Sequence, residues 1–332
     1  MMLLDGSYGE GGGQILRTAA ALSAVTGEPV EIINIRKGRP KPGLAIQHVK
    51  AVEIMGKICD AEVEGCFPGS TSLSFKPGKI KGGIYRIDIG TAGSIPLLLQ
   101  CLMPAAMYAS SPLELVVSGG TDVAWSPSID YLRFVTLRVL SRLGYKCDIR
   151  LIRRGYYPRG GGCVRAVISP SSLEKVDFNE NTCNLMKGIS HSSGLPPHVA
   201  QRQAASAEKI LLQEGYKTEI TLEINEYTSI GSGITLWCFA AGGIGLGMPG
   251  LRAEKVGQDA AHSILPELKS GSGVDIFLAD QLIPYMALAG GGSFTTRMIT
   301  PHTKTNIWVT EKFLDVKFNI EEMENGLFKA HL

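Results

Sequence analysis

Three Gly-Gly-Gly triplets, at residues 11–13, 160–162 and 290–292, punctuate a chain of 332 residues. Each triplet lies beside a similar succession of helical and strand-like sequence patterns. Self-similarity at a regular interval indicates a repeated structural unit. The chain is therefore predicted to contain a unit of about 80 to 90 residues three times, each copy with a small sheet that carries two helices.

The first copy illustrates the pattern. Apolar residues over 15–25 keep the three- and four-residue spacing of one helix face, and a glycine follows as a stop signal. Residues 28–35 alternate as a strand does, and residues 43–59 return to helical spacing. A comparable order of elements recurs over residues 91–168 and 275–320.

Residues 183–270 interrupt this order between the second and third copies, with strands and helices of their own. A segment with its own elements inside a repeated architecture is typical of an inserted domain. We therefore predict a protein of mixed α/β class (α+β), in which three repeated units form the large domain. Residues 1–182 and 271–332 are expected to form a large domain of three repeats, and residues 183–270 a smaller inserted domain.

Composition excludes several classes of protein. The formal net charge is only +2, so contact with nucleic acid must rely on a local basic patch. The seven cysteines contain no C-x-x-C pair, which favours reduced thiols in a cytoplasmic protein over a metal-thiolate site. Two long uncharged runs, residues 89–113 and 227–251, are broken by prolines and glycines, which indicates buried segments and no membrane span.

A glycine-dense loop with the sequence D-G-S-Y-G-E-G-G-G-Q-I-L-R occupies residues 5–17 and leads into a helix. Exposed N–H groups at a helix start attract anions, which suggests a phosphate cradle. The loop matches neither G-x-G-x-x-G nor G-x-x-x-x-G-K-[ST], and a tight turn explains it equally well. Gln14 and Arg17 share one face of the helix, just after Glu10.

Two further clusters of cations lie in loops. Residues 36–41 contain four cations in a turn that prolines stiffen, and Gln47 and His48 follow it. An anion-binding site and a solvated charged surface are equally good interpretations of this pattern. The second cluster, at residues 153, 154 and 159, consists of three arginines that precede the second glycine triplet. A phosphate site is one interpretation there, and a hairpin turn with exposed arginines is slightly favoured.

His302 lies in the sequence T-P-H-T-K, near the expected start of a helix. A neutral imidazole is a competent nucleophile toward phosphorus, and a helix start favours both the neutral form and a nearby phosphate. A structural role is the more common one for a single histidine beside a proline. The other histidines show no ligand spacing, so none is assigned to a metal.

Taken together, these stretches resemble the RNA 3′-terminal phosphate cyclase family along essentially the whole chain. The most specific motif is R-G-x-x-P-x-G-G-G-x-[LIV] at residues 154–164. Matches to D-G-x-x-x-E-G-G-G-Q-x-x-R, R-P-K-P-G-L and L-A-D-Q follow the family's order, at residues 5–17, 39–44 and 278–281. The resemblance implies three βαβαββ-type units and a smaller inserted α/β domain.

The resemblance also implies an activity. In this family ATP is used to convert an RNA 3′-phosphate into a 2′,3′-cyclic phosphate, by way of a histidine-AMP intermediate and an RNA-(3′)pp(5′)A intermediate, with release of pyrophosphate and AMP. The expected partners are ATP, RNA with a 3′-phosphate end and a divalent cation, Mg²⁺ or Mn²⁺. A cytoplasmic location is expected, and neither a membrane nor an obligate protein partner is.

The resemblance also implies a role for each residue of this chain that matches a functional position of the family. His302 takes the place of the nucleophile, with Arg17 and Arg39 as the other catalytic residues. The two arginines, Gln47 and His48 fall on positions that handle phosphate and the RNA end, and Glu10 on that of a metal-binding carboxylate. The resemblance implies an ATP site formed by Gln100, Pro127, Phe277, Asp280, Gln281 and His302. Pro127 and Phe277 would sandwich the adenine, although phenylalanine here replaces a tyrosine and lacks its hydroxyl.

Three alternatives belong to other functional classes. Relatives that lack the histidine act in ribosomal RNA processing without cyclase activity, and the presence of His302 argues against this reading. Enolpyruvyl transferases share repeated units and phosphorylated substrates, but the R-G-x-x-P-x-G-G-G signature and the histidine have no place there. A plain RNA-binding module is disfavoured because the sequence lacks an aromatic-rich binding signature and a large positive charge.

Overall fold

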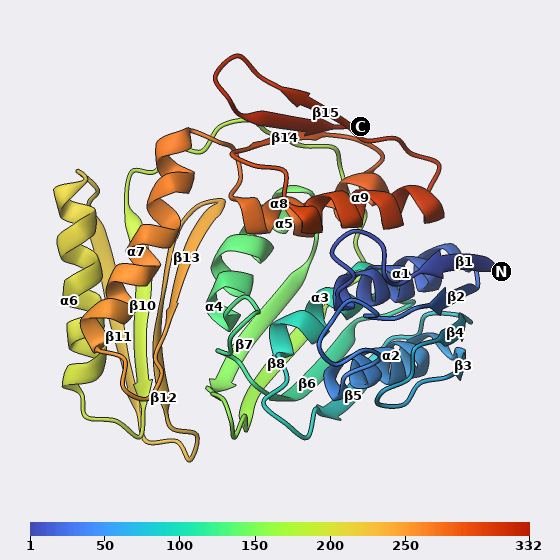
Figure 1. Ribbon diagram of the computed structural model, residues 1–332, viewed down its shortest axis with the longest axis horizontal. Coiled ribbons are helices and arrows are strands. Elements are labelled where there is room, and N and C mark those ends of the chain that lie inside the picture. The colour runs from blue at the N-terminus through green and yellow to red at the C-terminus, as the bar shows by residue number, and fades with distance from the viewer.

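The computed structural model describes all residues from Met1 to Leu332 and contains four four-stranded sheets (Figure 1). Three of the sheets belong to repeats of one βαβαββ unit, so the predicted fold class is confirmed. The first unit consists of β1 (Met2–Asp5), α1 (Gly13–Thr26), β2 (Val30–Ile33), α2 (Ile46–Cys59), β3 (Glu62–Glu64) and β4 (Leu73–Lys76).

The second unit has the same order, with its second helix divided into three parts by a π-helical turn, η1. It consists of β5 (Gly83–Asp88), α3 (Ile95–Ala106), β6 (Leu113–Gly119), α4 (Ile129–Tyr131), η1 (Leu132–Thr136), α5 (Leu137–Arg142), β7 (Cys147–Arg153) and β8 (Gly162–Ile168).

The third unit is split by the inserted residues after its first strand. It consists of β9 (Asp177–Phe178), α8 (Ile276–Ala289), β14 (Ser293–Thr296), α9 (Pro301–Phe313), β15 (Asn319–Glu322) and β16 (Phe328–His331). The insertion contains β10 (Met186–Ser193), α6 (His198–Gln213), β11 (Thr218–Asn225), β12 (Gly231–Cys238), β13 (Ala241–Leu246) and α7 (Ala253–Ser270).

All three repeated sheets have one topology. In each, the first two strands of the unit are parallel, the fourth strand pairs with the second in antiparallel fashion, and the third strand lies at the edge, as in the order β1-β2-β4-β3. The sheets lie on the outside, and α1, α3, α8 and α9 face one another in the centre (Figure 1). This arrangement brings helix starts from different units to a common centre.

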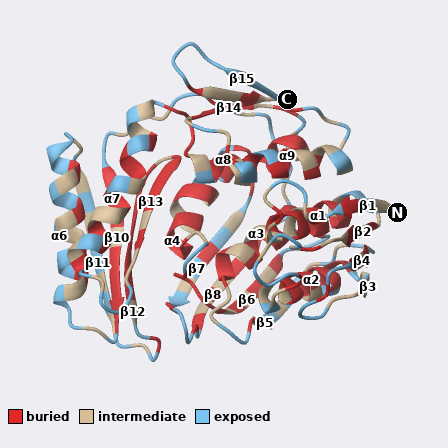
Figure 2. Cartoon of the chain, in the orientation of Figure 1, coloured by how far each residue is buried: buried red, intermediate tan, exposed pale blue.

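One large apolar core joins the three units, and a smaller one packs α6 and α7 against the fourth sheet. Figure 2 shows buried residues along the central helices and inner strands, whereas much of α6 is exposed. None of the helices combines the length and the hydropathy that crossing a membrane demands. The domain boundary at residues 183–270 stays a prediction, which the separate sheet and core support.

Arg154, the first residue of the second glycine-rich motif, is fully buried, with only 1% of its surface exposed. Its Nη1 lies 3.2 Å from Asp122 Oδ2, and its Nη2 lies 2.6 Å from Asp130 Oδ2 and 2.8 Å from Glu223 Oε2. The favoured interpretation, a hairpin turn with exposed arginines, is therefore wrong for Arg154, although the other arginines of this stretch, at 153 and 159, are exposed at the end of β7 and in the turn that leads to β8. The buried Arg154 guanidinium is not open to a phosphate either. The guanidinium instead joins the second unit to β11 of the insertion.

The cysteines differ from the expectation at one pair. Cys183, just before β10, and Cys238, at the end of β12, form a disulfide, whereas the other five are free. The prediction of reduced thiols throughout is therefore wrong for these two. No sequence pattern indicates this disulfide, because the two residues are 55 positions apart and meet only through the pairing of β10 with β12.

Replacement of Arg154 with alanine would leave the buried Asp122 without its cation and the buried Asp130 with Arg133 alone. Removal of one partner from a buried ion pair costs about 3–5 kcal/mol. We expect the free energy of unfolding, measured by urea titration, to fall by about that amount. Arg165→Ala, which breaks a more exposed pair with Glu114, is the control and should have a much smaller effect. Equal losses in the two variants would contradict this account.

Candidate active site

A single cavity of about 650 Å³ opens among α1, α3, α8, α9 and the loop that precedes α4, with β13 of the insertion on one side. Its size is within the range of small-molecule sites. All eleven site residues predicted from the sequence line it: Glu10, Arg17, Arg39, Gln47, His48, Gln100, Pro127, Phe277, Asp280, Gln281 and His302. The structure thus brings the positions together, and their individual roles stay predictions.

His302 is fixed in the first turn of α9. The Thr300 hydroxyl caps this helix by accepting a hydrogen bond from the Thr303 N–H at 3.1 Å, and Pro301 occupies the first helical position, where proline costs no hydrogen bond. Burial lowers the pKa of His302, the charges of Arg17 and Arg39 lower it further, and Glu10 opposes them. The imidazole is therefore neutral at physiological pH.

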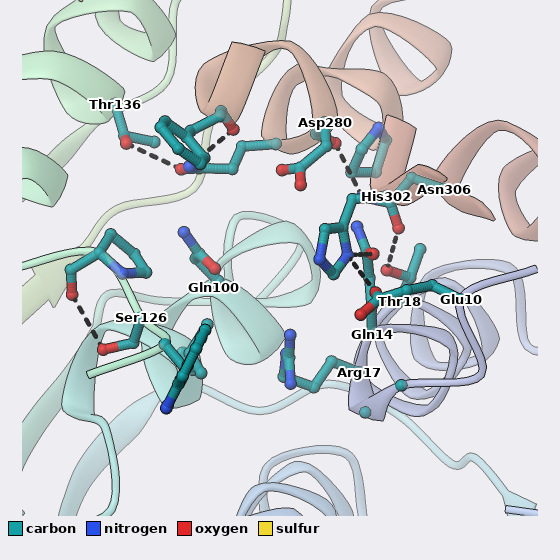
Figure 3. A pocket seen from close by; sticks show the side chains of 18 of the residues that line it. Glu10, Gln14, Arg17, Thr18, Gln100, Ser126, Thr136, Asp280, His302 and Asn306 are labelled. Carbon is teal, nitrogen blue, oxygen red and sulfur yellow. Dashed lines mark hydrogen bonds and ion pairs between the residues drawn. The ribbon is translucent and has the colours of Figure 1, made fainter. Parts of the chain in front are cut away.

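The two nitrogens of the His302 ring have different surroundings. Nδ1 lies 2.7 Å from Glu10 Oε2 and within hydrogen-bonding distance of Gln14 Oε1, as Figure 3 shows. Both neighbours are acceptors, so Nδ1 of the neutral ring carries the proton and Nε2 keeps a free lone pair. This tautomer is the one a nucleophile at Nε2 requires.

Glu10 is shared between two partners. One carboxylate oxygen contacts Nδ1 of His302, and the other pairs with the guanidinium of Arg39. A Cβ atom at Gly12 would lie 3.1 Å from Arg39 Nη2, and one at Gly13 would lie 2.1 Å from His48 Nε2. At these two positions the glycines therefore provide clearance for side chains of the protein itself.

His48 is buried, and burial lowers its pKa to about 3. Its Nδ1 accepts a hydrogen bond from the Ala45 N–H at 3.1 Å, at the start of α2. The neutral ring therefore has its proton on Nε2. His48 holds the beginning of α2 in place and offers the cavity a neutral donor.

The cations of the cavity come from the first unit. Arg17 points into the cavity from α1 (Figure 3), and it is in none of the ion pairs of the structure. Of the predicted basic turn, Arg36 and Arg39 line the cavity, whereas Lys37 and Lys41 do not. A guanidinium without a carboxylate partner is suited to a phosphate.

Two of the residues predicted to bind ATP have unused hydrogen-bonding capacity. The Nε2 atom of Gln100 is buried without a partner, which is costly unless a ligand supplies one. Burial raises the pKa of Asp280 to about 8, so its carboxyl is largely protonated at neutral pH and can donate a hydrogen bond. The carboxamide of Gln281 is already engaged, by the Thr136 hydroxyl at 2.8 Å and by the Phe277 carbonyl at 3.0 Å.

Sequence reasoning missed the residues that hold the helices in register. Asn306 accepts a hydrogen bond from the Thr18 hydroxyl at 2.7 Å and donates one to the Asp280 carbonyl at 2.7 Å (Figure 3). It thereby ties α9 to α1 and α8. The available signal was its spacing of four residues from His302, which places both on one face of a helix.

The fold and the site define a class: an α/β protein in which a neutral histidine shares a cavity with an arginine that has no ion-pair partner, a combination suited to phosphate transfer. The profile of the RNA 3′-terminal phosphate cyclase family matches residues 8–320. Proteins named RNA 3′-terminal phosphate cyclase from Methanococcoides burtonii and Methanosarcina barkeri are 60% and 58% identical to the chain, over 100% and 99% of both partners respectively.

Among solved structures, the enolpyruvyl transferase NikO from Streptomyces tendae aligns with 64% of this chain and 38% of its own, at 13% identity and a TM-score of 0.28. By its family profile and its full-length relatives, the chain belongs to the RNA 3′-terminal phosphate cyclase family.

The surroundings of His302 predict how its pKa responds to substitution. The anion of Glu10 favours the imidazolium, so Glu10→Gln should lower the pKa of His302 further below 6.5. An NMR titration of the imidazole Cε1–H signal, assigned through His302→Ala, measures this pKa. Glu53→Gln, which removes a carboxylate paired with Lys50 outside the cavity, is the control and should leave it unchanged. A rise in the Glu10→Gln variant would contradict the assigned contact.

Proposed function

We propose that this RNA 3′-terminal phosphate cyclase works through a covalent histidine-AMP intermediate on Nε2 of His302. The observation that best supports the proposal is that the two nitrogens of the His302 ring have different surroundings. Nδ1–H is hydrogen-bonded to Gln14 and lies 2.7 Å from the carboxylate of Glu10, and Nε2 is free on a neutral imidazole in the cavity. Arg17 stands in the same cavity without an ion-pair partner, where it can neutralise phosphate oxygens.

The first step forms a bond between Nε2 and the α-phosphorus of ATP as the bond from that phosphorus to the leaving pyrophosphate breaks. The ring gains a positive charge, which the carboxylate of Glu10 beside Nδ1 stabilises. In the second step an oxygen of the RNA 3′-phosphate attacks the same phosphorus, and His302 leaves as neutral imidazole.

The third step closes the ring. The neighbouring 2′-hydroxyl attacks the phosphorus of the RNA 3′-phosphate, loses its proton, and expels AMP. The product is a 2′,3′-cyclic phosphate. Because all three steps are in-line displacements at phosphorus, the main tasks of the protein are positioning and charge neutralisation. We assign the latter to Arg17 and Arg39, with Gln47 and His48 at the RNA end.

We assign ATP binding to the side of the cavity formed by the second and third units. We assign the two faces of the adenine to Pro127 and Phe277, because both line the cavity and 52% of the Phe277 surface is exposed. The free amide of Gln100 and the protonated carboxyl of Asp280 are the available donors. Gln281, whose polar atoms are engaged by its neighbours, orients the first turn of α8 at this site.

A divalent cation, Mg²⁺ or Mn²⁺, is compatible with Glu10. No group of three His, Cys, Asp or Glu side chains is arranged to hold a metal ion by itself. Mg²⁺ is commonly bound by one or two carboxylates, with water and substrate phosphates as its other ligands, and Glu10 supplies one carboxylate. When bound, the ion would neutralise charge on the phosphate oxygens. We also propose a cytoplasmic location, with ATP and RNA carrying a 3′-phosphate as the partners.

His302→Ala should abolish covalent labelling by ATP that carries a radioactive α-phosphate, because no other group is placed to attack. His262→Ala, which removes an exposed histidine of α7 outside the cavity, is the matched control and should label normally. Labelling that persists in His302→Ala would exclude this nucleophile. Arg39→Ala should label more slowly while its unfolding transition stays cooperative.

The complete reaction has its own measurement. RNA with a labelled 3′-phosphate should acquire phosphatase-resistant ends when incubated with the protein, ATP and a divalent cation. Ends that stay phosphatase-sensitive under these conditions would contradict the cyclase activity and favour a non-catalytic role in RNA processing.

A further inference from the structure

Trp125, in the loop between β6 and α4, is fully exposed, with 100% of its surface accessible, although it lines the cavity. The other two tryptophans are packed, since Trp237 stacks on Phe134 and Trp308 stacks on Tyr8. Trp125 makes no such contact. A large flat side chain is thus left with open faces at the site where substrates bind.

The backbone of Trp125 shows that this exposure is imposed by the structure. Its φ is 64°, in the left-handed region that bulky residues rarely adopt and that costs about 1–3 kcal/mol. The loop is anchored on both sides of it by the buried side chains of Asp122 and Ser128. The hydroxyl of Ser126 also contacts the Val123 carbonyl at 3.2 Å. Backbone strain of this kind is found most often at active sites and ligand-binding positions.

The reaction requires two nucleosides in the cavity at once, the adenosine of AMP and the terminal nucleoside of the RNA. Pro127 and Phe277 account for the adenine. The cations Arg17 and Arg39 account for phosphates, and no other exposed aromatic side chain in the cavity is unassigned. Proteins commonly bind an unpaired base by stacking it on an aromatic ring, which is tolerant of sequence because every base has a π face.

We propose that the indole of Trp125 stacks on the base of the 3′-terminal nucleotide of the RNA and so positions its ribose and 3′-phosphate. This inference rests on the proposed function. Trp125 is a positioning residue, since the stacking contact lies on the base and not on the reacting atoms. The contact makes the site selective for single-stranded ends with an intact terminal base and indifferent to which base it is.

Direct binding separates this inference from the proposed chemistry. Fluorescence anisotropy of a labelled RNA oligonucleotide with a 3′-phosphate measures its Kd without any need for adenylylation. Trp125→Ala should raise that Kd roughly 5-fold to 150-fold, the range expected for loss of one base stack. Trp125→Phe should recover most of the affinity. Phe67→Ala, which removes an exposed aromatic side chain outside the cavity, is the matched control and should bind normally.

An oligonucleotide with an abasic 3′-terminal nucleotide tests the contact itself. It should bind the unaltered protein more weakly by a similar factor, and Trp125→Ala should lose nothing further on it. A purely structural role for Trp125 would weaken binding of both oligonucleotides, which would overturn the proposal. So would an unchanged Kd, or a loss confined to the KM for ATP in the labelling reaction. If the substitutions change the Kd for RNA as predicted but the unaltered protein is not labelled by ATP, the proposed function is overturned and the stacking proposal is not.

Discussion

The contact between Nδ1 of His302 and the carboxylate of Glu10 is the interaction on which the site depends. It joins the first turn of α9 to the loop before α1, so it exists only when the first and third repeats are assembled. It fixes the proton of the neutral ring on one nitrogen and leaves a free lone pair on the other, which we propose as the nucleophile. The same carboxylate pairs with Arg39, which links the histidine to the cations of the cavity.

The repeated architecture explains how residues so far apart in the chain meet. Each βαβαββ unit presents helices to the centre, and the cavity lies where helix starts from the three units converge. Asn306 then holds α9 against α1 and α8 through hydrogen bonds from opposite sides of its amide. Burial at this junction sets the charge states, since it keeps His302 neutral and raises the pKa of Asp280 to about 8.

The recurring order of elements was enough to predict the repeats, although the glycine triplets lie at different places in the three units. Apolar periodicity located helices, and the resemblance to the cyclase family supplied the eleven predicted residues that line the cavity. What the sequence did not indicate depends on tertiary contacts. The local sequence around Arg154 is compatible with an exposed or a buried side chain. Its burial is decided by the tertiary contacts with Asp122, Asp130 and Glu223. Positions with unusual backbone, such as Trp125, likewise leave no periodic signal.

The central claim is that Nε2 of His302 is the atom that carries AMP. It is tested most directly by isolating the adenylylated protein in alkaline buffer, where phosphoramidates persist, after labelling its histidines with ¹⁵N. Heteronuclear NMR then identifies the nitrogen coupled to ³¹P. The account predicts coupling to Nε2 of His302, with Nδ1 still protonated. Coupling to Nδ1, or AMP on any other residue, would contradict it.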